Sequence, residues 1–165
     1  MKTIGIILIV FSGVWLAFKI YRSYQGRINV LRELLSDLEV IKNEVVFKKA
    51  TLCEALKKVK SEGICREFYE KILSSLKEGE GVREGFIKAM ESFSYCFSKE
   101  DERAVSDFGR LLGSTDVEGQ IRAFEIFGGE LKKNLSEAEK NKNEKMKSEC
   151  AAVIFGFAAV ALIVI

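Results

Sequence analysis

The 165-residue sequence contains neither proline nor histidine. Without histidine there is no His–Ser or His–Cys nucleophile pair, no imidazole metal ligand and no side chain whose unperturbed pKa lies near neutrality. Without proline, the residue that most effectively interrupts a helix is missing, which fits long helices. We therefore predict an all-α protein that makes contacts rather than catalyses a reaction, and we predict no enzymatic activity, no metal and no cofactor.

The chain has almost no net charge. Its 26 Lys and Arg residues oppose 24 Asp and Glu residues, giving a net charge of +2. Nucleic-acid binding needs a clustered basic excess, so we predict no nucleic-acid partner. The charges are also absent from both ends, because residues 3–18 and 150–165 contain none.

The two uncharged stretches predict two membrane-spanning helices, an N-terminal anchor over 1–21 and a C-terminal helix over 150–165. At ~1.5 Å per residue, sixteen residues span roughly 24 Å, and flanking residues extend this toward the ~30 Å hydrocarbon core. A buried core helix is the alternative for either stretch. A cleaved signal peptide is a further alternative for the N-terminus, but residues 15–22 offer no pair of small residues for cleavage.

Basic residues flank each uncharged stretch on the side that adjoins the central part of the chain. They are Lys19, Arg22, Arg27 and Arg32 after the first stretch, and Lys140, Lys142, Lys145 and Lys147 before the second. Because positive flanks stay in the cytoplasm, both stretches predict that the central residues 22–138 face the cytoplasm.

The central residues show helical periodicity throughout. Apolar side chains recur at three- and four-residue steps from Ile28 to Val45, which predicts a helix of about 20 residues. Capping-box spacing recurs where later helices are expected to begin, at Thr51 with Glu54, Ser98 with Asp101 and Thr115 with Glu118. The pattern predicts a compact bundle of about six helices over 22–138, with helices at 51–62, 64–77, 82–97 and 98–112 and a last one from 115, and helix ends at Gly63, Gly79, Gly81 and Gly113.

Residues 139–149 contain Met146 as their one apolar side chain and include no helix breaker. We interpret them as a charged helical stalk that continues the last helix of the bundle into the C-terminal stretch. A flexible linker of the same composition is the alternative.

The cysteines and glycines form no recognisable chemical motif. Cys53, Cys65, Cys96 and Cys150 include no CxxC pair, and a thiol oxidoreductase based on Cys53 and Cys65 would need their helices to meet. The glycines at 79–81 and 109–113 lack the GK[ST] ending of a phosphate loop. We interpret the thiols as free and these glycines as helix ends.

Particular residues resemble a known family. They are Ala50-Thr51-Leu52, the spacing Phe108-Gly109-x-x-Leu112-Gly113-x-x-Asp116-x-x-x-Gln120, and Asn143 to Lys147 running into a terminal apolar stretch. This order resembles the stage III sporulation protein AB family over essentially the whole length. The chain departs from it at Ala50-Thr51-Leu52, where the family commonly has Thr-Pro-Leu, and lacks the family's Leu-Gly pair before the last span.

The resemblance implies a function. Members belong to the apparatus that links mother cell and forespore during endospore formation, and their soluble domain is similar to that of the inner-membrane platform of type II secretion and type IV pilus systems. The implied protein lies in the outer forespore membrane with its domain in the mother-cell cytoplasm. Its implied partners are a cytoplasmic secretion-type ATPase, other channel membrane proteins and the lipid bilayer.

Two surfaces are candidates for the contact with the ATPase. One is the hairpin marked by Gly113, Asp116 and Gln120, although these residues also suit a simple helix end and cap. The other is the polar face of the first helix, with Arg32, Glu33, Asp37 and Glu44. Ala152 and Gly156 have small-xxx-small spacing, which suggests packing against residues 3–18 or against a second copy in a homo-oligomer. The alternative function is therefore an oligomeric membrane scaffold without ATPase coupling.

Overall fold

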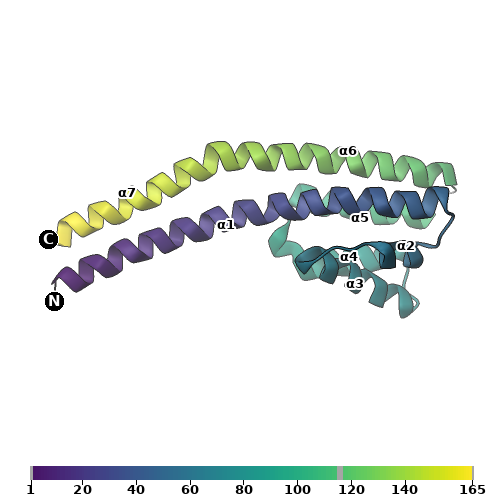
Figure 1. The fold of residues 1–165 in the computed structure, drawn as a ribbon, viewed down its shortest axis with the longest axis horizontal. Coiled ribbons are helices and arrows are strands. Elements are labelled where there is room, and N and C mark those ends of the chain that lie inside the picture. The colour runs from purple at the N-terminus through teal and green to yellow at the C-terminus, as the bar shows by residue number, and fades with distance from the viewer. Residues whose placement is uncertain (1, 115–116, 165) are drawn as a thin grey trace. The chain divides into compact units, whose positions relative to one another are not determined.

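The computed structural model describes the backbone of residues 2–114 and 117–164 and the side chains of residues 11–112 and 118–160. Helices make up nearly all of this part, and it contains no strand, as the sequence predicts (Figure 1). In chain order the elements are α1 (Lys2–Lys42), the π-helical turn η1 (Asn43–Phe47), α2 (Leu52–Lys58), α3 (Gly63–Lys77), α4 (Val82–Phe93), the 3₁₀ turn η2 (Ser94–Cys96), α5 (Lys99–Ser114), α6 (Val117–Asn141), the π-helical turn η3 (Lys142–Met146) and α7 (Lys147–Val164).

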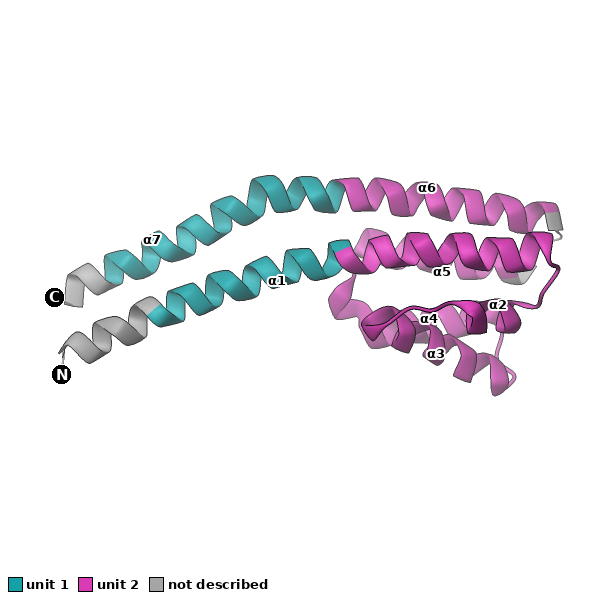
Figure 2. Ribbon diagram, viewed as in Figure 1, with its two compact units in different colours: residues 1–28, 137–165 teal, residues 29–136 magenta. Residues whose placement is uncertain are grey.

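The chain divides into two compact units (Figure 2). Unit 1 contains residues 1–28 and 137–165, and unit 2 contains residues 29–136. The long helices α1 and α6 each contribute to both units. Each unit is described separately below.

The core of unit 2 is built around a chain of aromatic rings. The ring of Phe68 on α3 packs edge-on against Phe86 on α4, with centroids 6.4 Å apart. Phe86 in turn meets Phe108 on α5 at 5.7 Å, and Phe108 stacks on Phe127 of α6 at 4.3 Å. Edge-to-face and offset contacts of this kind add stabilisation beyond the area they bury. The aromatic residues therefore link four helices through one continuous core.

The helix α1 supplies the other wall of this core. Leu31, Leu34, Leu38 and Ile41 are all buried, at the spacing that the sequence predicted for one helix face. Within unit 2, α3 packs on α4 and α4 packs on α5.

Two of the three predicted capping boxes are confirmed. The Thr51 hydroxyl accepts a hydrogen bond of 3.3 Å from the amide of Glu54, and the Glu54 carboxylate accepts one of 2.9 Å from the amide of Thr51. Ser98 and Asp101 make the same reciprocal pair at the start of α5. The third, at Thr115, lies outside the described residues.

The predicted end of α3 is confirmed, and the predicted ends of α2 and α4 are corrected. Gly79 follows α3 with a φ of +86°, and the amide of Glu80 reaches the carbonyl of Ser75 at 3.1 Å, which is a Schellman end. Gly63 does not end α2. That helix stops at Lys58, and Gly63, with a φ of +53°, begins α3. The prediction was wrong because Val59 adopts an extended backbone that the apolar pattern does not reveal. Similarly, α4 ends at Phe93 and tightens into the 3₁₀ turn η2 instead of continuing to residue 97.

The two segments of unit 1 run antiparallel and contact each other closely. A Cβ added to Gly13 would lie 2.9 Å from the Cβ of Phe157, so only glycine fits at this crossing. The Cys150 thiol donates to the carbonyl of Ala17 at 3.6 Å. Tyr24 donates to the Glu149 carboxylate at 3.1 Å.

No helix within the described part of the chain has the length and apolar content needed to cross a membrane. The predicted spans at 1–21 and 150–165 therefore receive no support from the structure. The side chains of residues 1–10 and 161–165, which belong to these stretches, lie outside the described part.

The backbone is helical from Val117 to Val164, with η3 as a π-helical turn inside this run. Where the sequence left a helical stalk and a flexible linker open for residues 139–149, the structure has helix.

Candidate partner-binding groove

A groove of about 380 Å³ lies in unit 2, where η1 and the start of α2 meet the start of α4, the end of α5 and the start of α6. Most of its walls are apolar, and Lys49, Thr51 and Gln120 contribute polar groups. The residues that line it are Val45, Val46, Lys49, Ala50, Thr51, Leu52, Val82, Leu112 and Gln120. A mainly apolar hollow with a few polar groups is typical of a binding site.

The turn after α1 forms one wall of the groove. The helix widens into η1, and the amide of Ala50 then bonds the carbonyl of Glu44 at 3.0 Å. Between them Lys49 has a φ of +54°, a left-handed conformation that is uncommon for residues other than glycine. The sharp change of direction presents Val45 and Val46 to the groove.

The capping box of α2 fixes the floor of the groove. Hydrogen bonds from the backbone amide and the hydroxyl of Thr51 lower the pKa of the Glu54 carboxyl, so the carboxylate that holds the box stays ionised. Thr51 thereby begins α2 without a proline.

Close packing of α5 on α4 sets the position of the opposite wall. A Cβ on Gly109 would lie 2.8 Å from the Cβ of Phe86, so glycine allows the two helices to approach. One turn later on α5, Leu112 reaches the groove.

The structure brings one member of the predicted hairpin to the groove. Gln120 is half-buried and lines it. Gly113 lies within α5, which continues one residue further to Ser114 and does not stop at the glycine. Asp116 lies outside the described residues.

The predicted polar face of α1 divides into exposed and buried members. Arg32 is exposed, and Glu44 is half-buried and pairs with Lys48 at 2.5 Å. Asp37 is only 6% exposed, so it faces the interior of unit 2 and not a partner. Glu33 is half-buried and accepts the backbone amide of Glu62 at 2.9 Å.

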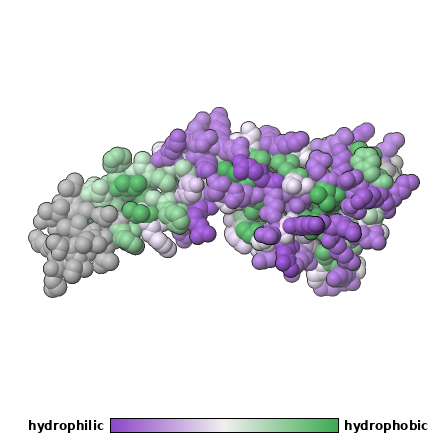
Figure 3. Space-filling model, viewed as in Figure 1, coloured by the Kyte–Doolittle hydropathy of each residue, from purple (hydrophilic) through white to green (hydrophobic). Residues whose placement is uncertain are grey.

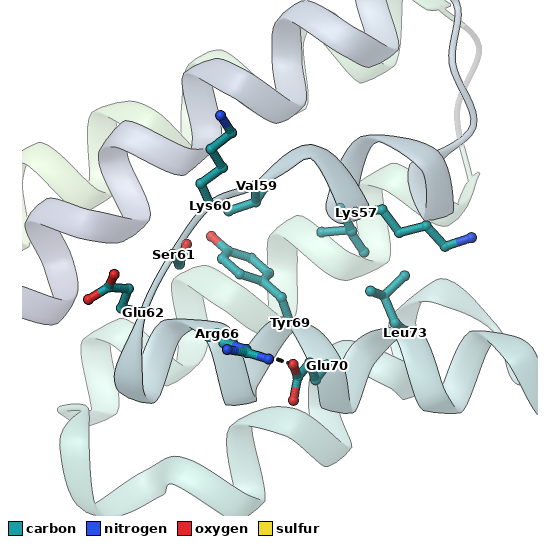
Figure 4. Close-up of a pocket in the computed structure, with 10 residues that line it drawn as sticks. Lys57, Val59, Lys60, Ser61, Glu62, Arg66, Tyr69, Glu70 and Leu73 are labelled. Atoms are coloured by element: carbon teal, nitrogen blue, oxygen red, sulfur yellow. Dashed lines mark hydrogen bonds and ion pairs between the residues drawn. The ribbon is translucent and has the colours of Figure 1, made fainter.

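Asp37 belongs to a buried polar network between α1 and α3. The Ser61 hydroxyl donates to Asp37 at 2.5 Å, and Tyr69 points from α3 toward the extended segment that carries Ser61 (Figure 4). Burial raises the pKa of Asp37, and the nearby Glu33 raises it further. Burial also raises the pKa of the Tyr69 hydroxyl, which therefore remains a donor.

Glu33, Asp37 and Cys65 place three potential metal ligands within 4.8 Å of one another. All three groups already take part in hydrogen bonds, however. Ser61 donates to Asp37, the amide of Glu62 donates to Glu33, and the Cys65 thiol donates to the carbonyl of Val30 at 3.7 Å. Burial raises the pKa of Cys65 far above its usual range, which opposes the thiolate that a metal needs. The donor set fits a hydrogen-bond network better than a metal site.

All four cysteines are free. Cys65 is 1% exposed, and its thiol is held in the protonated form by burial. A buried thiol of this kind is a poor nucleophile, so the geometry does not favour the oxidoreductase alternative based on Cys53 and Cys65.

Ala152 and Gly156 lie on an exposed face of α7. A Cβ added to Gly156 would meet no atom within 4 Å. The close crossing in unit 1 instead uses Gly13 and Phe157, which the sequence interpretation missed. The glycine at position 13 inside an apolar run was the available signal.

Comparison with known proteins decides the family. The sequence model of stage III sporulation protein AB matches residues 2–165. This chain belongs to the stage III sporulation protein AB family. Searches of curated proteins and of solved structures found no significant match.

Membership of the stage III sporulation protein AB family assigns the chain a sporulation-related role. In this member, two of the three segments that carried the resemblance border the same groove, because Thr51 comes from one of them and Leu112 and Gln120 come from another. Residues that are about 60 positions apart in the chain thus meet at one surface.

Proposed function

We propose that this protein is a non-enzymatic platform component of the channel or secretion-like apparatus between mother cell and forespore. In this proposal its helical domain binds a cytoplasmic secretion-type ATPase, and other channel membrane proteins surround its anchors. The observation that carries the proposal is the groove in unit 2, where two of the segments that carry the family resemblance meet.

The chemistry of the groove suits a protein partner. Apolar walls formed by Val45, Val46, Val82 and Leu112 fit the apolar face of a partner helix. Phe47, next to the groove in the chain, is 74% exposed. Exposed aromatic rings are common anchors in interfaces, which supports a contact surface here.

We further propose that the protein is anchored in the outer forespore membrane, with unit 2 in the mother-cell cytoplasm. The absence of charge in residues 3–18 and 150–165 supports membrane anchoring. The exposed apolar side chains of Phe11, Trp15 and Phe155 in unit 1 also support it, since such rings are costly to leave in water.

Capture of the cognate ATPase by the full-length protein in detergent tests the first proposal. Phe47→Ser and Gln120→Lys are expected to weaken capture at least about fivefold, as loss of an interface anchor costs more than ~1 kcal/mol. Tyr95→Ser is the matched control, because Tyr95 is 76% exposed on the 3₁₀ turn η2 and does not line the groove. Absence of capture in every nucleotide state, or equal losses in the Phe47 and Tyr95 variants, contradicts the proposal.

An oligomeric scaffold without ATPase coupling is the second candidate function. The exposed face of α7 with Ala152 and Gly156 favours it, because the crossing within unit 1 leaves this face open. Ala152→Leu with Gly156→Leu should then abolish self-association, measured by light scattering in detergent. Phe47→Ser and Gln120→Lys should leave function intact if this candidate is correct.

A further inference from the structure

We propose that Trp15, Phe18, Lys19 and Arg22 form a binding site for the phosphate headgroup of an anionic phospholipid. The proposal rests on the membrane anchoring proposed above and adds to it a lipid class and a set of residues. The described part of unit 1 contains the whole site.

The four side chains lie on one face of α1. Their spacing of three and four residues places them side by side along the helix, and together with Ser23 they line a shallow hollow of about 450 Å³. The Nζ of Lys19 lies 5.8 Å from the centroid of the Trp15 ring, and the guanidinium carbon of Arg22 lies 5.9 Å from that of Phe18. Each cation is therefore held beside an aromatic ring at the mouth of the hollow.

The apolar half of the site continues onto the uncharged stretch. Trp15 and Phe18 are 63% and 56% exposed, and the exposed side chains of Phe11 and Val14 precede them on α1. Figure 3 shows hydrophobic residues gathered over this part of unit 1. An aromatic ring between an apolar surface and a cation is typical of the boundary between acyl chains and headgroups.

The charge around the hollow selects the sign of the headgroup. Residues 11–28 carry Lys19, Arg22 and Arg27 and no acid. On η3, Lys142 lies with its Nζ 5.5 Å from the centroid of the Tyr21 ring, one residue before Arg22. Arginine binds phosphate oxygens in a bidentate manner, and lysine adds a point charge, so the hollow suits a phosphate that carries net negative charge in its lipid.

Trp15 makes the proposal measurable, because it is the one tryptophan of the chain. The full-length protein is reconstituted into phosphatidylcholine vesicles that contain a fraction of phosphatidylglycerol. Bromine on the acyl chains of either lipid quenches nearby tryptophan fluorescence. At equal mole fractions, we expect brominated phosphatidylglycerol to quench Trp15 more strongly than brominated phosphatidylcholine, with a relative association constant of about five for each basic residue engaged.

The double variant Lys19→Gln/Arg22→Gln should lose this preference and bring the relative constant to about one. Lys57→Gln/Lys60→Gln removes the same charge from exposed positions in unit 2 and should keep the preference. Circular dichroism checks that each variant is helical. Competition by inorganic phosphate against chloride of equal ionic strength should leave the preference unchanged.

Equal quenching by the two lipids overturns the headgroup site while membrane anchoring stands. Absence of quenching by either lipid overturns both, because Trp15 then does not lie at a bilayer. A preference that survives in the Lys19/Arg22 variant overturns the assignment to these residues, and one that inorganic phosphate abolishes identifies a site for the free anion instead.

Discussion

Asn134 donates a hydrogen bond of 2.8 Å to the Asp101 carboxylate in the interior of unit 2. Asp101 is 0% exposed and Asn134 is 5% exposed, so neither side chain is available to bulk water. The other oxygen of Asp101 accepts the amide of Ser98 at 2.9 Å. One buried carboxylate thus caps α5 and ties it to α6.

Asn134→Ala is expected to lower the free energy of unfolding by about 1–3 kcal/mol, because it removes a donor from a buried charged acceptor. Denaturant unfolding followed by circular dichroism measures the loss. Asn143→Ala, at an exposed position, is the control and should change the free energy by less than ~0.5 kcal/mol. Similar losses in the two variants would show that the buried bond contributes nothing specific.

The glycine at 109 is expected to be irreplaceable for packing reasons. Gly109→Ala places a Cβ 2.8 Å from that of Phe86, so α5 must move away from α4, and we expect a loss of about 1–3 kcal/mol. Gly129→Ala is the matched control, since a Cβ there meets no atom within 4 Å. The control should gain about 0.5–1 kcal/mol from better helix propensity. Thermal unfolding of the two variants compares them, and a stabilising Gly109→Ala would contradict the close approach.

Periodicity and capping chemistry predicted most of unit 2. The stripe from Leu31 to Ile41 is buried as expected, and the boxes at Thr51 and Ser98 begin their helices. These signals are local, because a helix face and a cap each depend on residues within one or two turns. The end of α2 at Lys58 was missed since Val59 is apolar and gives no sign of its extended backbone.

The groove depends on contacts that no local pattern reveals. Gln120 was selected from the sequence, but Val45, Val46 and Val82 reach the groove only through the π-helical turn and the helix packing. Asp37 was selected for its charge, and the structure buries it beside Ser61 and Tyr69 because α3 covers that face of α1. A polar residue on an amphipathic helix does not show in the sequence whether a second helix covers it.

Asp37 is expected to make stability depend on pH. Its pKa is raised by burial above the usual value of 3.8, so the folded protein holds this proton more tightly than the unfolded chain. The stability that this proton contributes is fully present below pH 3.8 and is lost as the pH rises through the raised pKa, because the native state binds more protons than the unfolded chain over this range. As the pH rises from acid to neutral, the unfolding free energy of the wild type should therefore fall relative to that of Asp37→Asn.

Glu39→Gln, which removes an exposed acid from the same helix, is the control for this series. Its difference from wild type should not follow the same course with pH. If Asp37→Asn were destabilised equally at every pH, the carboxyl would act through packing and not through its proton.

Lys49 stores backbone strain beside the groove, and its removal is expected to stabilise the protein. The φ of +54° costs an L-residue roughly 1–2 kcal/mol, and glycine adopts it freely. After the entropy that glycine adds to the unfolded chain, Lys49→Gly should raise the free energy of unfolding by about 1 kcal/mol. The neighbouring Lys48 has a φ of −93°, so Lys48→Gly should instead be destabilising. Denaturant unfolding of the two variants gives the sign of each change. Lys49 also lines the groove, and Lys49→Gly keeps the turn while it removes the lysine charge. Capture of the ATPase by this variant would therefore show that the groove needs the turn and not the charge.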